Sequence, residues 1–500
     1  MSSTSPSSSG VLSLDVVDLR ASYAARRLSP VDVVRHVYDR IATYPDPAVW
    51  ITLVPREEAI RRAEQLIAEY KYNDDDTGRD LILPPLFGIP FSVKDSIDVA
   101  GLPTTLACPT FAYQATETAP AIARLLAAGA ILVGKTNLDQ FATGLAGVRS
   151  PHGAPRCVHD RAYISGGSSS GSAVSVAASL VSFTVCTDTG GSTRVPAALN
   201  GVVGLKPSLG TISNVGVVPA CRNIDCVCVM ARRVRDVRAV WDVVRAFDER
   251  DIFARRHLPP WPAWRDPIRF AIPPQDVLRA VLAPAYAELF GKIVDVLRRQ
   301  GHTQHQAQDQ DQEEEGHTSW RVVEASASFD YTPFAAANQM LHDSSIMAQR
   351  LLTFEPYIQA HGLESLDPAI AQTFRQGLAK GFSATRAYAD IFTLAGHKRA
   401  AEVQFREHTD VLVVPSTVDH FTVAQLQEEP MARNAAMGPF AHFVNLLDLA
   451  AVSVPVGWWV GQNGKKLPFG VTVVGQAGKD EELMDFGEKI MQMMGTAGAS

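Results

Sequence analysis

The stretch GGSSSGSAVSVAASLVSFTVCTDTGGSTR, residues 166–194, decides the fold and gives the first sign of chemistry. Residues 171–180 are mostly Ala, Ser and Val, which favours a closely packed helix, and residues 181–187 predict a short buried strand. The chain then turns through two glycines, whose backbone N–H groups can converge on a developing negative charge. Two glycine-flanked serines, Ser168 and Ser192, bracket this helix and strand. Ser192 lies in the turn, where a nucleophile would be placed.

A lysine upstream supplies a candidate base. Lys94 lies in the run FSVKDSID, residues 91–98, where apolar residues alternate with polar ones. Desolvation on such a half-buried strand disfavours the ammonium form, and a neutral lysine can act as a general base. Ser–Lys pairs replace the Ser–His–Asp triad in some hydrolases. Taken singly, a solvated lysine and glycine-rich linkers would explain these features, but together they favour a hydrolase.

These segments resemble the amidase signature family of Ser-Ser-Lys hydrolases. The resemblance rests on GGSSSGSA (166–173), TDTGGSTRVPA (187–197) and PFSVKDSIDVAG (90–101). It extends through residues 83–91, 121–144 and 201–210, and therefore covers most of the chain. The resemblance implies an α/β amidase signature fold, in which a large mixed twisted sheet is covered by helices on both faces.

The resemblance also assigns catalytic roles. Ser168 and Ser192 have the separation of the family's two catalytic serines. Ser192 would be the acylated nucleophile, Ser168 the bridging serine on a cis peptide bond, and Lys94 the base that feeds it. The oxyanion hole would be lined by Thr189, Gly190, Gly191 and Ser192. Asp188 and Arg194 would flank and brace this turn, by pairing with each other or with nearby backbone, unless both are ordinary surface charges.

Several passages look more like the allophanate hydrolase branch of the family than like other members. They are residues 22–51, 135–156, 216–227, 443–457 and 467–475. The sequence departs from that branch at three places. The nucleophile turn reads TDTGGSTR instead of TDTAGSGR, a usual Tyr is His342, and a Thr-Asn pair is Ala441-His442.

The resemblance suggests which residues bind substrate. Arg350, in MLHDSSIMAQR, occupies the position of an arginine that holds the substrate carboxylate, a task that suits a planar guanidinium. His342 lies eight residues earlier, about two helical turns, so both side chains could share one face. Ala142 and Ser168 complete the expected substrate-binding set. The alternatives are a surface histidine at His342 and, for Arg350, a solvated ion pair with a nearby acidic residue, Asp343 or Glu355.

The sequence therefore predicts an amidohydrolase that cleaves a linear C–N amide or carbamoyl bond through a serine acyl-enzyme. The expected substrate is a small acidic or pathway-specific amide. Two alternatives stay open. One is amide-group transfer within an amidotransferase complex, which no basic or tail-like element supports. The other is a non-catalytic binding scaffold, which retention of Lys94, Ser168 and Ser192 disfavours.

Composition sets outer limits. The chain has 500 residues, of which 46% are hydrophobic and 20% charged, with a net charge of −7. This balance is that of an ordinary soluble globular protein, for which we expect a cytoplasmic location, and the negative net charge without a long basic run makes nucleic acid and anionic membranes unexpected partners. A homodimer is compatible with the sequence. No cofactor or metal is expected, because the histidine-containing tract 302–317 has no apolar scaffold to fix ligand geometry.

We expect one amidase domain. Its boundaries are residues 11–490, with a disordered tail at 1–10, another tail at 491–500 and no C-terminal allophanate hydrolase domain. A helical, substrate-facing region is expected at about 235–410, with residues 302–317 as an exposed low-complexity loop. Within the domain, the patterns predict strand-like structure at 215–218, one helix at 277–299 and one helix at 335–354.

Overall fold

The computed structural model describes residues 12–72, 82–302, 321–325 and 327–496. The tail expected at 1–10 and almost all of the loop expected at 302–317 lie outside these residues. Within them, two sheets are formed. The strands are β1 (Trp50–Leu53), β2 (Pro90–Lys94), β3 (Pro103–Thr104), β4 (Tyr113–Gln114), β5 (Ile131–Thr136), β6 (Phe183–Asp188), β7 (Val203–Lys206), β8 (Cys226–Ala231), β9 (Ile268–Ala271), β10 (Val322–Glu324), β11 (Val411–Pro415), β12 (Leu449–Val460) and β13 (Lys466–Gln476).

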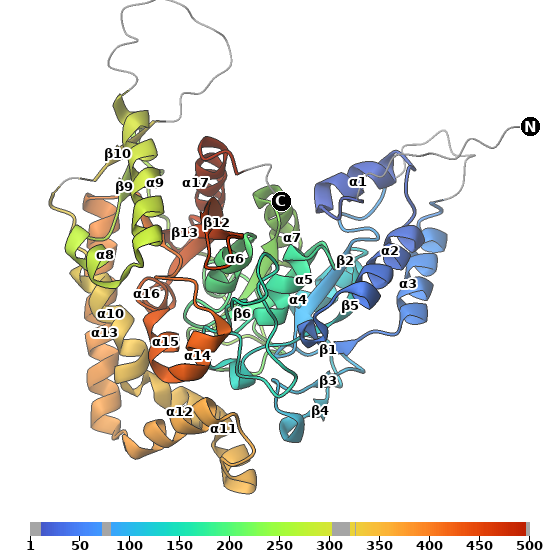
Figure 1. Ribbon diagram of the computed structural model, residues 1–500, viewed down its shortest axis with the longest axis horizontal. Helices are drawn as coiled ribbons and strands as arrows, with labels where there is room; N and C mark the ends of the chain where they lie inside the picture. The colour runs from blue at the N-terminus through green and yellow to red at the C-terminus, as the bar shows by residue number, and fades with distance from the viewer. Residues whose placement is uncertain (1–11, 73–81, 303–320, 326, 497–500) are drawn as a thin grey trace, which may run out of the picture.

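The larger sheet has 11 strands in the order β1-β5-β2-β6-β8-β7-β12-β13-β11-β9-β10 (Figure 1). It is mixed: β5, β2 and β6 are parallel, as are β11, β9 and β10, and the strands between β6 and β11 are joined by antiparallel ladders. The predicted large mixed sheet is confirmed. Strands β3 and β4 form a separate antiparallel pair.

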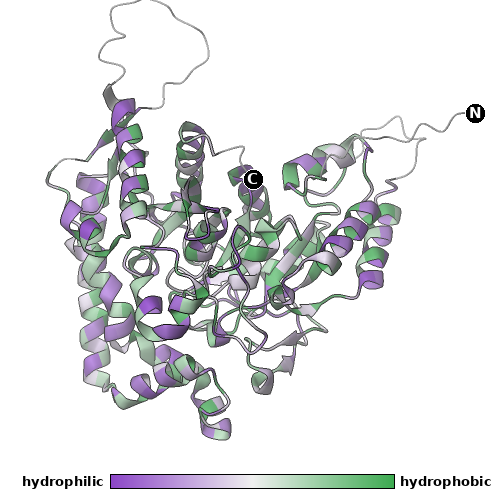
Figure 2. Ribbon diagram, in the orientation of Figure 1, coloured by the Kyte–Doolittle hydropathy of each residue, from purple (hydrophilic) through white to green (hydrophobic). Residues whose placement is uncertain are grey.

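Helices flank this sheet and carry the chain between its strands. They are α1 (Val16–Ala24), α2 (Pro30–Thr43), α3 (Arg56–Glu69), α4 (Pro120–Ala127), α5 (Ser170–Ala177), α6 (Arg194–Asn200), α7 (Val234–Val244), α8 (Gln275–Val281), α9 (Pro284–His302), α10 (Thr332–Asp343), α11 (Ala348–His361), α12 (Pro368–Ala379), α13 (Ala384–Glu407), α14 (Val423–Glu428), α15 (Pro430–Ala436), α16 (His442–Leu446) and α17 (Asp480–Met493). Figure 2 shows hydrophilic and hydrophobic residues mixed along the outer helices. This pattern is typical of amphipathic helices that pack one face on the core and expose the other to solvent.

The middle of the sheet positions the site. Every residue of β2 and β6 is buried, because helices cover both faces there. Phe91 pairs with Phe183 across the two strands, and their rings stack with centroids 5.2 Å apart. Parallel strands end at the same sheet edge. In this register Lys94, the last residue of β2, is level with Cys186, and β6 continues two residues further along the same edge to Asp188.

Three predicted elements are wrong in their boundaries. Residues 215–218 form no strand, and Val217 makes only an isolated bridge with Ile97. The helix expected at 277–299 is two helices, α8 and α9, because Pro284 begins a new helix and cannot continue the old one.

The helix expected at 335–354 is also two helices, α10 and α11. The Ser344 hydroxyl accepts the N–H of Ile346 and so caps a short 3₁₀ turn, Ser345–Met347, between them. The region 235–410 is mainly helical, as expected, but it also supplies the strands β9 and β10.

The C-terminal end differs from the expected tail as well. Helix α17 continues past residue 490, and both Ile490 and Met491 are buried in the main core.

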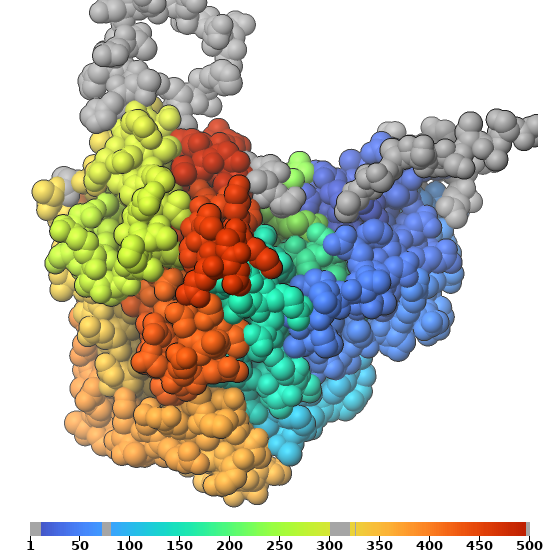
Figure 3. All heavy atoms as spheres, viewed as in Figure 1, coloured from blue at the N-terminus to red at the C-terminus, as the bar shows by residue number. Residues whose placement is uncertain are grey.

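Figure 3 shows the N-terminal part of the chain on the right of the visible face and helices α11 and α12 along its lower edge. No helix among the described residues is both long and apolar enough to cross a membrane.

Candidate active site

Lys94 is fully buried at the sheet edge and contacts two side-chain hydroxyls. Its Nζ donates to Ser168 Oγ at 2.8 Å and to Thr187 Oγ1 at 2.9 Å, and lies 3.4 Å from the Thr187 carbonyl oxygen. Burial lowers the pKa of Lys94 from 10.5 to about 8, although the nearby Cys186 and Asp188 oppose this change. The amine is therefore far more easily deprotonated than a surface lysine.

Ser168 follows a cis peptide bond with Gly167, as the resemblance implied. The loop around it is held against the nucleophile turn, because the Ser169 N–H donates to the Ser192 carbonyl at 3.3 Å. Among the described residues, no hydrogen bond joins the hydroxyls of Ser168 and Ser192. The structure thus brings Lys94 and Ser168 into contact and places Ser192 beside them without closing the second link.

Asp188 and Arg194 brace the turn with a buried ion pair. The guanidinium donates twice to the carboxylate, from Nη2 to Oδ1 at 2.9 Å and from Nε to Oδ2 at 3.1 Å. Burial favours the neutral acid, but Arg194 and two backbone N–H groups hold the pKa of Asp188 well below its usual range. Both side chains are buried, so the surface-charge alternative is wrong and the expected pairing is present.

The N–H groups of the turn do not all face the same way. The Gly191 N–H donates to Asp188 Oδ1 at 2.7 Å, so it is turned away from the cavity. In the part of the chain that the structure describes, the N–H groups of Thr189, Gly190 and Ser192 make no hydrogen bond. The predicted four-donor hole is therefore corrected to three available donors. The role of Gly191 in the turn is conformational instead: its φ of 121° is a backbone angle that favours glycine.

Asp225 anchors the front of the turn and was not predicted. Its Oδ1 accepts the Thr189 hydroxyl at 2.5 Å, and its Oδ2 accepts the N–H groups of Ala220 and Cys221. The antiparallel pairing of Asp188 with Cys226 brings it there. Burial raises the pKa of Asp225. The only sequence signal for this residue would have been the register of β8, a strand that the patterns did not reveal.

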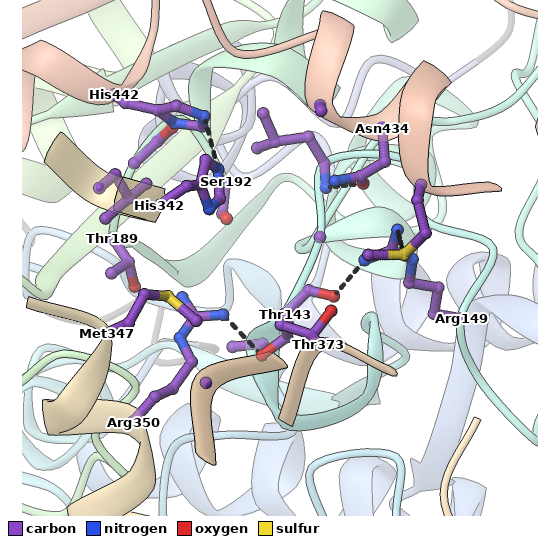
Figure 4. A pocket seen from close by; sticks show the side chains of 18 of the residues that line it. Thr143, Arg149, Thr189, Ser192, His342, Met347, Arg350, Thr373, Asn434 and His442 are labelled. Carbon is purple, nitrogen blue, oxygen red and sulfur yellow. Dashed lines mark hydrogen bonds between the residues drawn. The ribbon is translucent and has the colours of Figure 1, made fainter. Parts of the chain in front are cut away.

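A cavity of about 420 Å³ opens over the turn (Figure 4). Thr189, Gly190 and Ser192 form one side of it, and the rest of the lining comes from the loop 142–149, from the helices α10 to α12 and α15, and from Met347 and His442. The predicted substrate-binding residues Ala142, His342 and Arg350 all line it. Ser168, in contrast, is fully buried and is not among the lining residues, so its place in the site is behind the cavity.

Two arginines converge on Thr143 in the cavity wall. Arg350 Nη1 donates to Thr143 Oγ1 at 2.7 Å, and Arg149 Nη1 donates to the Thr143 carbonyl at 3.2 Å. The Nε of Arg350 is buried and makes no hydrogen bond within the described residues. No ion pair there joins Arg350 to Asp343 or Glu355, so the solvated-pair alternative is wrong. Sequence reasoning missed Arg149, which lies in a loop without a motif of its own.

His342 contacts His442, so two departures from the allophanate hydrolase branch lie against each other. Their Nε2 atoms are 3.3 Å apart, and His442 Nδ1 lies 2.7 Å from the Gly190 carbonyl oxygen. Burial and then His342 lower the pKa of His442 to about 3. Desolvation and, after it, Arg350 lower the pKa of His342 to about 4. His442 was not predicted as a site residue.

The described residues contain no group of three or more His, Cys, Asp or Glu side chains that could hold a metal ion. The polar groups at the cavity are instead hydroxyls, N–H groups, two guanidinium groups, two imidazoles and the amides of Gln376 and Asn434. This set can bind a carboxylate, activate a hydroxyl and stabilise an oxyanion.

Comparison with known proteins gives consistent matches. A model of the amidase family matches residues 32–484. The urea amidolyase of Saccharomyces cerevisiae is 34% identical over 490 residues, which cover 96% of this chain and 24% of that protein. A glutamyl-tRNA(Gln) amidotransferase subunit of Symbiobacterium thermophilum is 32% identical over 496 residues, covering 94% of this chain and 95% of that protein. The solved allophanate hydrolase of Kluyveromyces lactis has a TM-score of 0.80 and 31% identity, over 96% of this chain and 72% of that one.

The fold, the buried Lys94–Ser168 contact and these matches define an enzyme that acts on C–N bonds of amides. The chain belongs to the amidase family. It spans about a quarter of the length of the curated urea amidolyases that it matches.

Proposed function

We propose that this chain hydrolyses the C–N bond of a small acidic amide or carbamoyl compound through an acyl-enzyme on Ser192. The observation that carries the proposal is the 2.8 Å contact between the Nζ of Lys94 and the Oγ of Ser168 in a fully buried setting. A neutral amine there can accept the proton of Ser168, which in turn can accept that of Ser192. Lys94, Ser168 and Ser192 would thus act as one proton relay.

Each proton in this reaction has a donor and an acceptor. Ser192 Oγ attacks the carbonyl carbon while its proton moves to Ser168 and the proton of Ser168 moves to Lys94. The oxyanion is held by the N–H groups of Thr189, Gly190 and Ser192. The C–N bond then breaks, and the proton returns through the same relay to the leaving nitrogen. Water then attacks the acyl carbon and gives a proton to the relay of Ser168 and Lys94; the bond to Ser192 Oγ breaks, the relay returns the proton to that oxygen, and the acid leaves. The Ser168–Ser192 link would tighten when substrate fills the cavity, as catalytic hydrogen bonds often do.

The cavity wall supports an acidic substrate. Arg350 and Arg149 place two positive charges near Thr143, and the unpartnered Nε of Arg350, among the described residues, gives spare donor capacity. Planar guanidinium groups can meet both oxygens of a carboxylate. The allophanate hydrolase and urea amidolyase names of two relatives support allophanate as one substrate to test. The His342–His442 pair makes the cavity wall differ from that expected for the allophanate hydrolase branch. This difference supports a related acidic amide as a second substrate to test.

Two further expectations belong with this proposal. All six cysteines are free and buried, which supports a reducing compartment such as the cytoplasm. The similarity to an amidotransferase component over 94% of the chain favours a second candidate, glutamine hydrolysis with transfer of ammonia to a partner. A preference for glutamine over malonamate would distinguish this candidate, because glutamine carries an α-ammonium beside its carboxylate whereas malonamate carries the carboxylate alone.

The test is ammonia release from allophanate, malonamate, glutamine and the neutral benzamide, for the wild-type chain and Ser192→Ala. We expect turnover of an acidic amide, slow or no turnover of glutamine, and no turnover by the variant. Trapping of an acyl adduct on Ser192 by mass spectrometry would identify the nucleophile. Undiminished activity in Ser192→Ala would overturn the mechanism, and a preference for glutamine would favour the second candidate.

A further inference from the structure

His442 joins the cavity wall to the nucleophile turn. Its Nδ1 lies 2.7 Å from the Gly190 carbonyl oxygen, and its Nε2 lies 3.3 Å from the Nε2 of His342 on α10. The ring is 5% exposed. It fits because glycines surround it: a Cβ at Gly438 would collide with the imidazole, and one at Gly190 would lie 3.0 Å from His442 Nδ1. The position is built around an imidazole.

The partners of the two rings fix where their protons lie. A carbonyl oxygen can only accept, so His442 Nδ1 carries a hydrogen and donates it to Gly190. The low pKa of the buried His442 keeps the ring neutral, which leaves its Nε2 with a lone pair. His342 must then donate from its own Nε2. These tautomers are assigned from hydrogen-bond partners, and they give one direction of donation, from His342 to His442 to Gly190.

The peptide between Gly190 and Gly191 is held at both ends. His442 binds its carbonyl oxygen, and Asp188 Oδ1 binds its N–H at 2.7 Å. A peptide unit is planar, so fixing both ends fixes the rotation of the plane. The N–H groups of Gly190 and Ser192 flank this peptide, and their directions depend on that rotation. Donors that are oriented before the reaction stabilise an oxyanion without reorganising.

We infer that His442 is a positioning residue that sets the oxyanion turn by holding the Gly190 carbonyl, and that His342 holds His442 in the tautomer able to do so. The inference rests on the proposed function, because the turn is an oxyanion hole only in an acyl-transfer reaction. The inference also links substrate choice to catalysis, because His342 in the cavity wall becomes coupled through His442 to the N–H donors of the oxyanion turn. A substrate that displaces His342 would loosen the hole and be turned over slowly.

Two substitutions at one position separate the contacts of His442. The amide of Asn occupies the place of Nδ1, so His442→Asn keeps a donor for Gly190 and loses the contact with His342. The amide of Gln occupies the place of Nε2, so His442→Gln keeps a partner for His342 and loses the Gly190 contact. We expect kcat to fall more than about fiftyfold in His442→Gln and less than about fivefold in His442→Asn, with KM within about threefold in both, because loss of a hole donor costs about 10²–10³ in kcat.

A double-mutant cycle tests the role of His342. His342→Phe removes the donor that fixes the tautomer, so kcat should fall several-fold in the wild-type background. In His442→Asn the imidazole is already gone, so adding His342→Phe should leave kcat where it was. Thermal unfolding of all variants checks that each folds. Equal kcat losses in His442→Asn and His442→Gln, or full additivity in the cycle, would show a merely structural pair.

Imidazole ¹⁵N NMR tests the tautomers without any turnover. With ¹⁵N-labelled histidine, the signals that vanish in His442→Asn and His342→Phe identify the two rings among the 13 histidines. We expect the proton on Nδ1 of His442 and on Nε2 of His342. A proton on Nε2 of His442 would overturn the inference even in an active enzyme. If the tautomers are as expected but the protein hydrolyses no amide, the proposed function is wrong, whereas the hydrogen bond from His442 to the Gly190 carbonyl is still supported.

Discussion

Lys94 gives the clearest pH dependence at the scale of a single residue. Its pKa is lowered to about 8 by burial, and the titratable groups that face it are Cys186 and Asp188 on β6, Cys228 on β8, and Asp139. Only the neutral amine can accept the proton of Ser168. We therefore expect kcat/KM to rise with pH and to level off above about pH 8, measured on an acidic amide. A profile that is flat from about pH 6 to 9 would mean that another group is the base.

The same burial makes Lys94 costly for stability. Below about pH 8 the folded chain carries a buried ammonium, whereas the unfolded lysine titrates near 10.5. We expect Lys94→Met to be inactive but to raise the free energy of unfolding at about pH 7 by up to about 3 kcal/mol. This gain should shrink as pH rises from about 8 to 10.5, because wild-type Lys94 is then neutral when folded. Denaturant unfolding at neutral and at alkaline pH measures both values, and a destabilised variant at neutral pH would contradict the account.

Gly191 should be intolerant of a side chain. Its φ of 121° is unfavourable for other residues, and a Cβ would lie 2.7 Å from the Cβ of Ala441. We expect Gly191→Val to lower kcat at least about a hundredfold while the free energy of unfolding falls by about 1–3 kcal/mol. Gly291→Ala in α9 is the matched control, since nothing lies within 4 Å of its Cβ. Gly291→Ala should retain wild-type kcat. A near-normal kcat in Gly191→Val would show that this turn does not take part in the reaction.

Sequence motifs identified Lys94, Ser168 and Ser192 because each lies in a local segment whose residue types are specific. They could not identify Asp225, Arg149 or His442. Each of these reaches the site through tertiary register rather than spacing, for example through the pairing of Asp188 with Cys226. The direction of the Gly191 N–H could not be predicted from the sequence either, because two adjacent glycines can adopt several backbone conformations.

At the scale of elements, the helices α10 to α12 contribute Leu341, His342, Arg350 and Thr373 to the cavity wall. Arg350 on α11 lines the cavity and donates to Thr143, and on the proposed function its guanidinium would bind the carboxylate of the substrate. We expect Arg350→Ala to raise KM for malonamate about ten- to a hundredfold, the value of a lost charge-assisted hydrogen bond. KM for benzamide should change less than about threefold. Equal changes for both amides would show that Arg350 only braces the wall.

Element boundaries show where pattern reading fails. Apolar periodicity predicted one helix at 277–299 and one at 335–354, but it ran across the breaks at Pro284 and Ser344, because apolar residues recur on both sides of each break. It missed β8, since CVCVMA is apolar throughout and buried on both faces. Short edge strands such as β10 carry too few residues for any period to show.

At the scale of the whole molecule, one sheet joins the two sides of the site. The proposed catalytic residues lie at the end of β2, just before α5 and after β6, and the cavity wall comes from the loop 142–149 and the helices α10 to α12, α15 and α16. The family resemblance predicted this mixed sheet, since the matched segments run through most of the chain. The arrangement of the late strands β11 to β13 between β7 and β9 does not follow from periodicity, because it depends on contacts between distant segments.

The reach of Arg194 to the Ala441 carbonyl and the Asn445 side chain has a consequence for synthesis on the ribosome. A nascent chain that has emerged only as far as α9 already contains Lys94, Ser168 and Ser192. It still lacks the segment that covers Gly190 and the wall that holds a substrate. On the proposed function, the serine that would attack the substrate is therefore synthesised before the segments that complete its site, and a chain that ends at α9 should release no ammonia from an amide.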